Sequence, residues 1–446
     1  MKINFKNNFD TKLIFLKLLF YGFPLFMFTR SAYINAYIFI IIIFSLFFFF
    51  KEKIRIKFST LDYLILLFFI SSILSTLLNI QEIKNFNIGG KEINFEISTL
   101  TKSFFNLRFL ILYIIIKNII DKKFVDIKFF SKISLTCSFF LVFNIILQHI
   151  IGYDLFGNPP FDYRYNGFFE HEAIAGSYLQ KFFLISILSI FLLDAKHDKK
   201  FTLIFISINI IGLGILLSFD RMPYLVFVLS IFLLLLILKN FRSLLLLNLL
   251  SIIFIFIFFF YNYSQLKERY LGLSRQLDLS IVKNLFHFRS SDLTTVTADN
   301  VNLQSDYLKN YIIAYKVILK NPIMGSGLKS FSFECEKLEI INKTVNCMTH
   351  PHNIYLEILV NQGIIGISIF FIFIFILIKK NYLIFFSSKI LMQDKLLSLF
   401  IFTILVIELI PLRSYGSIFS TINGSIFWFF LALISINSSL NKSPNK

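Results

Sequence analysis

Long apolar runs separated by short polar segments dominate the chain. A helix needs about 20 apolar residues to cross roughly 30 Å of hydrocarbon. Runs of this kind cover residues 13–29, 31–50, 61–80, 103–120, 129–151, 174–194, 201–219, 222–239, 244–263, 354–378, 396–410 and 417–437. The pattern predicts an all-α, polytopic transmembrane helix bundle of about twelve spans. The first run has no small-residue cleavage site, so no removable signal peptide is expected.

Basic residues mark one side of this predicted membrane protein. With the N-terminus placed inside, the inner segments and both termini hold 23 Lys and Arg, and the short outer loops hold 7. Because Lys and Arg collect in cytoplasmic loops, both termini are expected in the cytoplasm. The predicted organisation is then a membrane bundle of about nine spans (1–263), a large outward loop (264–353), a bundle of about three spans (354–437) and a cytoplasmic tail (438–446).

The outward loop of about 90 residues is too long to be a simple connector. From Asp306 to Asn321 its apolar residues recur at helical spacing, which predicts an amphipathic helix lying on the membrane or on the bundle. Gly325 and Gly327 follow Pro322 and predict a sharp turn. The loop is therefore expected to contain short helices and to be functional.

The same loop contains two of the three cysteines. Cys335 and Cys347 would face an oxidising compartment in a bacterial inner-membrane protein, and a disulfide between them is a candidate feature. A zinc site that also uses His350 and His352 is the less favoured alternative, because a clear pattern of four ligands is missing. Cys137 lies inside a predicted span and is interpreted as a packed apolar residue.

Composition narrows the class of protein further. Hydrophobic residues make up 57% of the chain and charged residues 16%, and the mean hydropathy is +0.75. Soluble domains average about 45–50% apolar and about 25% charged residues, so a soluble enzyme is excluded. The net charge of +18 does not indicate a nucleic-acid partner, because the basic residues lie between apolar runs and not on one folded face.

Arginine is the informative cation, because the chain has 10 Arg against 34 Lys. Arg30, Arg164, Arg221 and Arg413 lie in short outer loops, on the side that disfavours basic residues. A guanidinium binds phosphate oxygens with two parallel hydrogen bonds, which an ammonium cannot do. The alternative is that each arginine only reaches lipid headgroups, and this is the favoured interpretation for Arg30.

Two histidines, His350 and His352, precede the apolar run 354–378. Gly363 and Gly366 follow His352 by 11 and 14 residues, about three and four helical turns, so both are expected below it on one helical face. Small residues there would let a neighbouring helix approach closely. A helix N-terminus disfavours an imidazolium, so a neutral His352 could accept a proton. The alternative is a histidine that only caps the helix.

The histidine segment resembles a known family. His352-Asn353, nine residues and Gly363-Ile-Ile-Gly366 match the His-Asn-x9-Gly-x-x-Gly pattern of the O-antigen ligase and polymerase superfamily, membrane glycosyltransferases that use lipid-linked sugar donors. The segment 321–327 is similar to the Pro and Gly-x-Gly turn of the family's long outer loop.

Two upstream segments carry the same resemblance. Ser218-Phe-Asp-Arg221 resembles a Ser-x-x-Arg motif at the outer end of a span, which implies a donor-binding role for Arg221. The segment 164–179, which includes Arg164, Glu170 and His171, resembles an outer loop of the family. The family's loop helix usually opens with an arginine and a tryptophan. Here tyrosines stand near those positions, and the nearest upstream arginine is Arg289.

The resemblance implies a membrane enzyme that transfers O-antigen glycan from undecaprenyl pyrophosphate to lipid A-core, by an inverting displacement at the periplasmic face of the bacterial inner membrane. His352 and Arg221 would be catalytic. The predicted substrate-binding residues are Arg164, Arg413, Arg289, Asn353, Glu170 and His171. Gly325, Gly327, Gly363 and Gly366 would be structural.

No metal or other cofactor is expected from the sequence, because no dense carboxylate cluster suggests one. The partners implied are the lipid-linked donor, the acceptor and membrane lipids, without nucleic acid. A polymerase that joins repeat units from the same donor is the alternative function. A transporter is less favoured, because few charges lie within the predicted spans and no internal repeat is seen.

Overall fold

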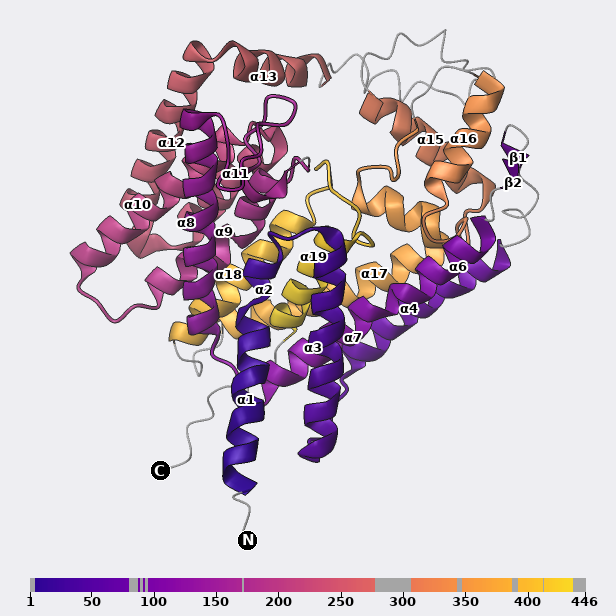
Figure 1. The fold of residues 1–446 in the computed structure, drawn as a ribbon, viewed down its shortest axis with the longest axis horizontal. Coiled ribbons are helices and arrows are strands. Elements are labelled where there is room, and N and C mark those ends of the chain that lie inside the picture. The colour runs from indigo at the N-terminus through magenta and orange to yellow at the C-terminus, as the bar shows by residue number, and fades with distance from the viewer. Residues whose placement is uncertain are drawn as a thin grey trace.

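The chain folds into a bundle of helices (Figure 1). The computed structural model describes residues 5–79, 87–88, 91–92, 95–170, 172–276, 306–342, 347–386, 392–411 and 413–435. The elements of the first part are α1 (Phe5–Tyr21), α2 (Phe23–Phe26), α3 (Ser31–Lys51), α4 (Thr60–Leu78), β1 (Asn87–Ile88), β2 (Lys91–Glu92), α6 (Phe95–Phe105), α7 (Leu107–Asp121), α8 (Ile127–Ile151) and η1 (Gly167–Phe169). Those of the remainder are α9 (Ala175–Phe191), α10 (His197–Leu217), α11 (Arg221–Ile237), η2 (Lys239–Phe241), α12 (Arg242–Asn262), α13 (Ser264–Gln276), α15 (Asp306–Lys320), α16 (Phe331–Asn342), α17 (Ile354–Phe386), α18 (Met392–Glu408) and α19 (Thr421–Ile434).

Helices account for the membrane-spanning part of the described chain. Seven helical segments are long and apolar enough to cross a membrane, and they are 31–51, 60–78, 99–121, 127–151, 197–217, 239–262 and 354–386. The apolar helices α9, α11 and α19 are shorter. The predicted polytopic helix bundle is therefore confirmed, whereas the number of twelve spans remains a prediction. The two-residue strands β1 and β2 add only a small antiparallel hairpin.

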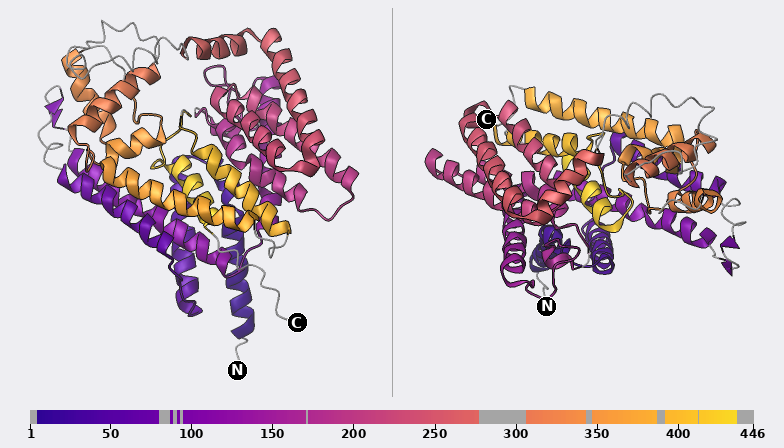
Figure 2. Two further views of the ribbon diagram at one scale, coloured as in Figure 1. Left: turned by 180° about the vertical axis from the view of Figure 1, so that it is seen from behind. Right: turned by 90° about the horizontal axis from the view of Figure 1, so that it is seen from above.

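The helices gather in two groups joined by a central part (Figure 1). Helices α8, α10, α11, α12 and α13 lie on one side, and α4, α6, α15, α16 and α17 lie on the other. Helix α17 runs alongside α4 from each direction of view (Figure 2). Helix α1 begins at the end of the bundle remote from α13, α15 and α16 (Figure 1). This arrangement fits the expectation that the N-terminus and the large loop lie on opposite sides.

Burial varies among the helices in the way that a membrane bundle requires. Helix α9 is buried along its length from Tyr178 to Phe191, so it contacts protein on all sides and need not match the thickness of the lipid. Only 22% of the apolar window of α12 is buried, and Phe254 on this helix is 71% exposed. Exposed apolar side chains of this kind are typical of a lipid-facing helix.

Aromatic rings fill the central part of the bundle. The ring of Phe23 stacks on that of Phe429, with their centroids 3.8 Å apart. Trp428, next to it on α19, is fully buried and packs against Phe69 of α4 with a centroid distance of 4.8 Å. Ring pairs of this kind add about 0.5–1.5 kcal/mol beyond their buried area. They fix α19 between α2 and α4.

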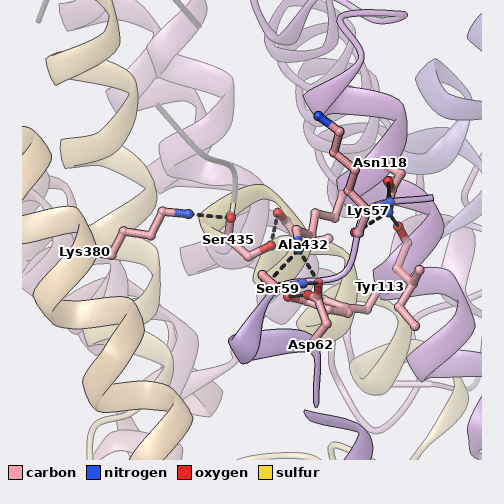
Figure 3. Close-up of polar contacts among 10 residues, drawn as sticks. Lys57, Ser59, Asp62, Tyr113, Asn118, Lys380, Ala432 and Ser435 are labelled. Atoms are coloured by element: carbon pink, nitrogen blue, oxygen red, sulfur yellow. Dashed lines mark hydrogen bonds and ion pairs between the residues drawn. The ribbon is translucent and has the colours of Figure 1, made fainter. Parts of the chain in front are cut away.

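A buried polar network ties α4 to α7 at the end remote from the large loop (Figure 3). The Lys117 ammonium forms an ion pair with the Asp62 carboxylate, and both residues are 2% exposed. Asp62 also accepts a hydrogen bond of 2.8 Å from the Tyr113 hydroxyl and one of 2.6 Å from the Ser59 backbone N–H. Ser59 is the N-cap of α4. The network therefore joins a helix cap to a neighbouring helix through a buried ion pair.

Replacing Lys117 by methionine is expected to lower the free energy of unfolding by about 3–5 kcal/mol, because the Asp62 carboxylate would stay buried without its counter-charge. Denaturant unfolding of the full chain in detergent measures this change. Lys132→Met, at an exposed position of α8, is the matched control and should change stability by less than about 0.5 kcal/mol. Equal losses in both variants would show that the ion pair is not the cause.

Candidate active site

Helix α17 is broken at Gly363, which has φ +61° and ψ −158°. The N–H groups of Ile364 and Ile365 therefore leave the helical pattern and donate to the carbonyls of Pro322 and Ile323, at 2.8 and 3.2 Å. A side chain at Gly363 would overlap the Ile323 carbonyl. Glycine is thus required here both by its positive φ and by the close approach of the turn.

The turn of residues 322–327 also binds the residues of α17 that come just before the break at Gly363. The N–H groups of Ser326 and Gly327 donate to the carbonyls of Val360 and Asn361, at 2.8 and 3.2 Å. The Pro and Gly-x-Gly segment of the outer loop and the Gly-x-x-Gly segment of α17 therefore form one backbone-bonded unit, although the sequence presented them as separate motifs.

The expectation that Gly363 and Gly366 lie below His352 on one helical face is wrong. It assumed a continuous helix, and the break at Gly363 changes the direction of the backbone. Gly366 instead makes room for the side chain of Gln362, because a Cβ at Gly366 would overlap it. The Gln362 side chain in turn accepts a hydrogen bond of 2.7 Å from Ser71 of α4. The two glycines support the docked turn and the contact between α17 and α4.

Cys335 and Cys347 form a disulfide in the structure, with their Cα atoms 5.8 Å apart. The bond joins α16 to the segment that precedes His350. Cys335 is buried in a small cluster with Ala314 of α15 and Val360 of α17. The amphipathic helix expected over 306–321 is α15, and it packs on the bundle through this cluster.

Replacing Cys335 by serine is expected to lower stability by about 3 kcal/mol, the value for closing a short loop in the chain-entropy model. The residues joined are 12 apart in the sequence. Thermal unfolding with and without reductant measures the effect. Reductant should destabilise the wild type and leave the variant unchanged. Cys137→Ser, a change at a free thiol, is the control that should keep the response to reductant.

His350 and His352 lie together ahead of α17, with their ring centroids 4.1 Å apart. Burial lowers the pKa of His350 to about 4, and burial also lowers the pKa of His352. Both rings are therefore neutral at pH 7. The backbone of His352 has φ +55°, and its carbonyl accepts a hydrogen bond of 2.8 Å from the Tyr415 N–H. This bond fastens the histidine segment to the loop of residues 413–420.

Asn353 caps the first part of α17. Its side-chain oxygen accepts hydrogen bonds from the N–H groups of Tyr355 and Leu356, at 3.0 and 3.2 Å, and its amide nitrogen donates to the Pro411 carbonyl at 2.5 Å. These bonds satisfy two free N–H groups of the helix. The structure thus gives Asn353 a positioning role beside His352, and its predicted role in substrate binding remains a prediction.

Arg413 is buried, with 4% of its surface exposed. Its guanidinium pairs with the Glu408 carboxylate at 3.1 Å and donates to the Gln180 side-chain oxygen at 2.6 Å. It also lies over the ring of Tyr415, 5.0 Å from the centroid. Lys181 lies over the same ring at 4.8 Å. Two cations therefore lie over the ring of Tyr415, the residue whose backbone N–H binds the His352 carbonyl, and one carboxylate pairs with Arg413.

Arg164 and Arg221 converge in a second cluster, with Arg269 of α13. Arg164 pairs with Asp220 at 3.4 Å and lies 3.8 Å from Asp162. Arg269 pairs with Asp162 at 3.6 Å, and its backbone carbonyl accepts a hydrogen bond of 2.8 Å from Arg221. Burial raises the pKa of Asp220 to about 6, against the opposing charges of Arg164 and Arg269. We call Arg164, Arg221 and Arg269 the arginine cluster.

Helix α9 connects the arginine cluster to Arg413. The N–H of Gly176 donates to Asp220 at 3.2 Å, and Gln180, four residues later, accepts from Arg413. Residues four apart on a helix lie about 6 Å apart along one face. The α9 residues that contact the two groups are therefore about one helical turn apart, and Arg413 is held by partners different from those of the arginine cluster.

The remaining predicted site residues lie apart from these clusters or outside the described residues. Glu170 pairs with Arg30 at 2.7 Å, and the Arg30 side chain is 72% exposed. This pair is at the surface, in line with the interpretation of Arg30 as a headgroup-level residue. His171 and Arg289 lie outside the residues that the structure describes.

Sequence reasoning missed Arg269, Gln180 and Tyr415. Arg269 lies in the segment predicted as the large outer loop. In the structure it lies on α13, a helix that follows α12 closely, and the sequence pattern does not show its contact with Asp162. Gln180 follows the Gly-Ser-Tyr-Leu segment directly, so one more residue of that motif would have included it. For Tyr415, no sequence signal distinguishes it from the other 18 of the 19 tyrosines in the chain.

A small pocket adjoins the Arg413 cluster. Most of its walls are apolar side chains of α18 and α19, and the residues that line it are Ile404, Leu405, Glu408, Tyr415, Ile426, Phe427, Phe430, Leu431 and Ile434. Its two polar lining residues, Glu408 and Tyr415, are those that contact Arg413. Apolar space therefore lies next to buried positive charge.

Comparison with known proteins addresses the identity of this site. Residues 203–371 match the family model described as O-Antigen ligase. The match begins in α10 and ends beyond the break in α17, so it includes Arg221, Arg269, the docked turn and His352. No curated protein matches the chain. The match supports the predicted resemblance to the O-antigen ligase superfamily over this part of the chain.

Proposed function

We propose that the protein is an O-antigen ligase, which transfers glycan from undecaprenyl pyrophosphate to lipid A-core at the periplasmic face of the bacterial inner membrane. The match to the O-Antigen ligase family model supports a ligase-like or polymerase-like membrane glycosyltransferase. The observation that carries the proposal is the arginine cluster, which contacts the same helix, α9, as Arg413. Such a group of cations suits a diphosphate at the membrane surface.

The arginine cluster would hold the diphosphate of the donor. Arg164 and Arg269 pair with the carboxylates of Asp162 and Asp220, and Arg221 donates to the Arg269 carbonyl, so three cations with two carboxylates leave a net positive charge. Arg164 Nε and Arg269 Nη1 are buried and have no hydrogen-bond partner within the described residues. Buried donors without partners are unfavourable unless an acceptor reaches them. Phosphate oxygens would supply such acceptors.

His352 would act as the general base. Its neutral ring would take the proton of the acceptor hydroxyl as the acceptor oxygen bonds to the anomeric carbon of the donor sugar. The bond from that carbon to the phosphate oxygen breaks in the same step, and the electron pair leaves with the diphosphate. A single displacement of this kind inverts the anomeric configuration. The arginines would stabilise the charge that grows on the leaving group.

The proposed reaction needs no metal ion, because the guanidinium groups supply the positive charge for the leaving diphosphate. Transfer by the purified full chain from a synthetic undecaprenyl-pyrophosphate donor to lipid A-core tests the proposal, with and without a chelator. Equal rates in both conditions are expected. Absence of transfer by the wild type under both conditions would contradict the proposed function.

A deletion strain separates the ligase from a polymerase that uses the same donor. Loss of a ligase leaves finished polymer on its lipid carrier. Loss of a polymerase leaves core molecules that bear single repeat units and no long chains. Accumulation of carrier-bound polymer is the expected result, and single capped repeats would overturn the assignment as ligase in favour of a polymerase.

A further inference from the structure

Lys329 is carried by the turn that docks on α17. The N–H of Leu328 donates to the Thr76 hydroxyl of α4 at 2.9 Å, and the N–H of Lys329 donates to the Asn361 side chain at 3.2 Å. Thr76 also contacts Ser103 of α6, at 3.3 Å between the hydroxyl oxygens. The backbone of Lys329, with φ +58°, is thereby fixed where α4, α6 and α17 meet.

Three cations gather around this meeting point. Thr76, which holds the turn that carries Lys329, contacts Ser103, the neighbour of Lys102 on α6. The Arg108 guanidinium donates to the carbonyl of Phe105, two residues after Ser103. The charge of Lys329 is influenced by Lys102, Arg108 and the buried Glu357. Glu357 lies one helical turn before Asn361 on the first part of α17, which explains its closeness to the turn. Within the described chain, no carboxylate forms an ion pair with Lys102, Arg108 or Lys329. The group therefore has a net positive charge.

Arg108 is the most unusual of these cations, because it lies inside a predicted span and is 8% exposed. Its guanidinium donates to the Phe105 carbonyl at 2.8 Å and lies 4.2 Å from the centre of the Phe109 ring. Its Nε is buried without a partner among the described residues. A charged residue inside the membrane without a counter-ion is expensive and usually functional.

This cation group adjoins the histidine pair on the side away from the arginine cluster. His350 interacts electrostatically with Lys329. The Glu357 carboxylate accepts a hydrogen bond of 3.3 Å from the N–H of Ile418, in the same loop that holds His352 through Tyr415. The loop of residues 413–420 thus has Arg413 and α9 on one side and Glu357 with its cations on the other.

We infer that Lys102, Arg108 and Lys329 form a second anion-binding site, which holds a phosphate group of the acceptor while the arginine cluster holds the donor. The inference rests on the proposed function, because it requires an acceptor at His352. Two acceptors share the required chemistry: a phosphorylated lipid A-core and a repeat unit on a lipid diphosphate. An enzyme that joins two anionic substrates needs separate places for their charges, since like charges repel strongly at short range.

The test measures initial rates of transfer by the purified full chain at varied acceptor concentration. The acceptors are phosphorylated lipid A-core, the same core after chemical dephosphorylation, and a synthetic repeat unit on undecaprenyl pyrophosphate. Lys329→Gln is expected to raise the KM for the phosphorylated acceptor about 10- to 100-fold, the value of a charge-assisted hydrogen bond. The KM for the donor should change less than about twofold, a difference too small to reflect a lost contact.

Two further variants keep the test decisive. Lys329→Arg retains the charge and should restore most of the affinity for the phosphorylated acceptor. Lys316→Gln removes one positive charge from α15, on the same outer loop, and should leave all constants unchanged. With dephosphorylated core, Lys329→Gln and the wild type should have the same KM. The acceptor that shows the effect, core or lipid-linked repeat, identifies the source of the phosphate.

Failure of this inference is distinguishable from failure of the proposed function. If the wild type transfers glycan and Lys329→Gln raises the KM for dephosphorylated core equally, the second site is overturned and the first proposal stands. A raised KM for the donor would also overturn it, because it would assign Lys329 to donor binding. If the wild type transfers nothing to either acceptor, the proposed function itself is contradicted.

Discussion

Replacing His352 by alanine is expected to lower kcat for glycan transfer by about 10²- to 10⁴-fold, the contribution of a general base. The KM for the donor should change little, because the arginine cluster holds the diphosphate through other side chains. Initial rates with a synthetic lipid-linked donor measure both constants. If the alanine variant keeps its activity within about threefold of the wild type, the loss is much smaller than a general base usually contributes. That result would show that His352 is not the base.

The pH dependence of transfer gives an independent check on His352. Its pKa is lowered from the ordinary 6.5 by burial, so the ring is neutral and able to accept a proton at and above pH 6.5. The rate should therefore be level near pH 8 and should fall to half of that level only at a pH below 6.5. His350→Ala, a change in the adjacent ring, is the matched control and should keep this profile.

Because His352 has a positive φ, a loss of activity could also arise from the backbone. Asparagine adopts positive φ more readily than most residues. His352→Asn therefore keeps the backbone and removes the base, and it should be as inactive as the alanine variant. An active asparagine variant would assign the effect to the backbone of the loop instead of proton transfer.

Replacing Arg221 by alanine is expected to lower kcat by about 10²- to 10³-fold, the effect of removing one donor that stabilises developing charge. Its guanidinium also donates to the Arg269 carbonyl, so the loss would loosen a second member of the cluster. Transfer kinetics from the lipid-linked donor measure the change. Arg221→Lys keeps the charge but not the planar fork and should fall between the alanine variant and the wild type.

Arg30→Ala provides the control for this prediction. Arg30 is an outer arginine of the same type, but its side chain is 72% exposed and, among the residues that the structure describes, its ion pair is with Glu170. An exposed pair contributes little, so transfer should stay within about twofold of the wild type. Equal losses in Arg30→Ala and Arg221→Ala would indicate a general effect of outer positive charge and would contradict a specific diphosphate site at the arginine cluster.

The helical bundle could be predicted from the sequence because the signal is simple. Every long apolar run must satisfy its backbone polar groups internally, and a helix does so without partners. The number of spans could not be fixed in the same way. Helices such as α9 and α19 are short because protein surrounds them, and hydropathy alone does not distinguish lipid from a protein interior.

The candidate site was predictable only in its components. The positions of Arg221 and His352 follow from motifs next to the end of an apolar run, and that of Arg164 follows from a motif in the loop between two runs. Their grouping did not follow, because it depends on contacts between distant segments. Arg413 illustrates this point. The sequence predicts one role for it and the other outer arginines, whereas in the structure it is buried and held by Gln180 and Glu408.

The break in α17 sets a rule for exchanging parts between related enzymes. The N–H groups of Ile364 and Ile365 find their acceptors only in the 322–327 turn. Within lipid, water could not replace those acceptors. A chimera that grafts a foreign outer loop onto this bundle must therefore carry the turn and the glycine segment from the same parent. Junctions placed between them would leave a membrane helix with unsatisfied amides.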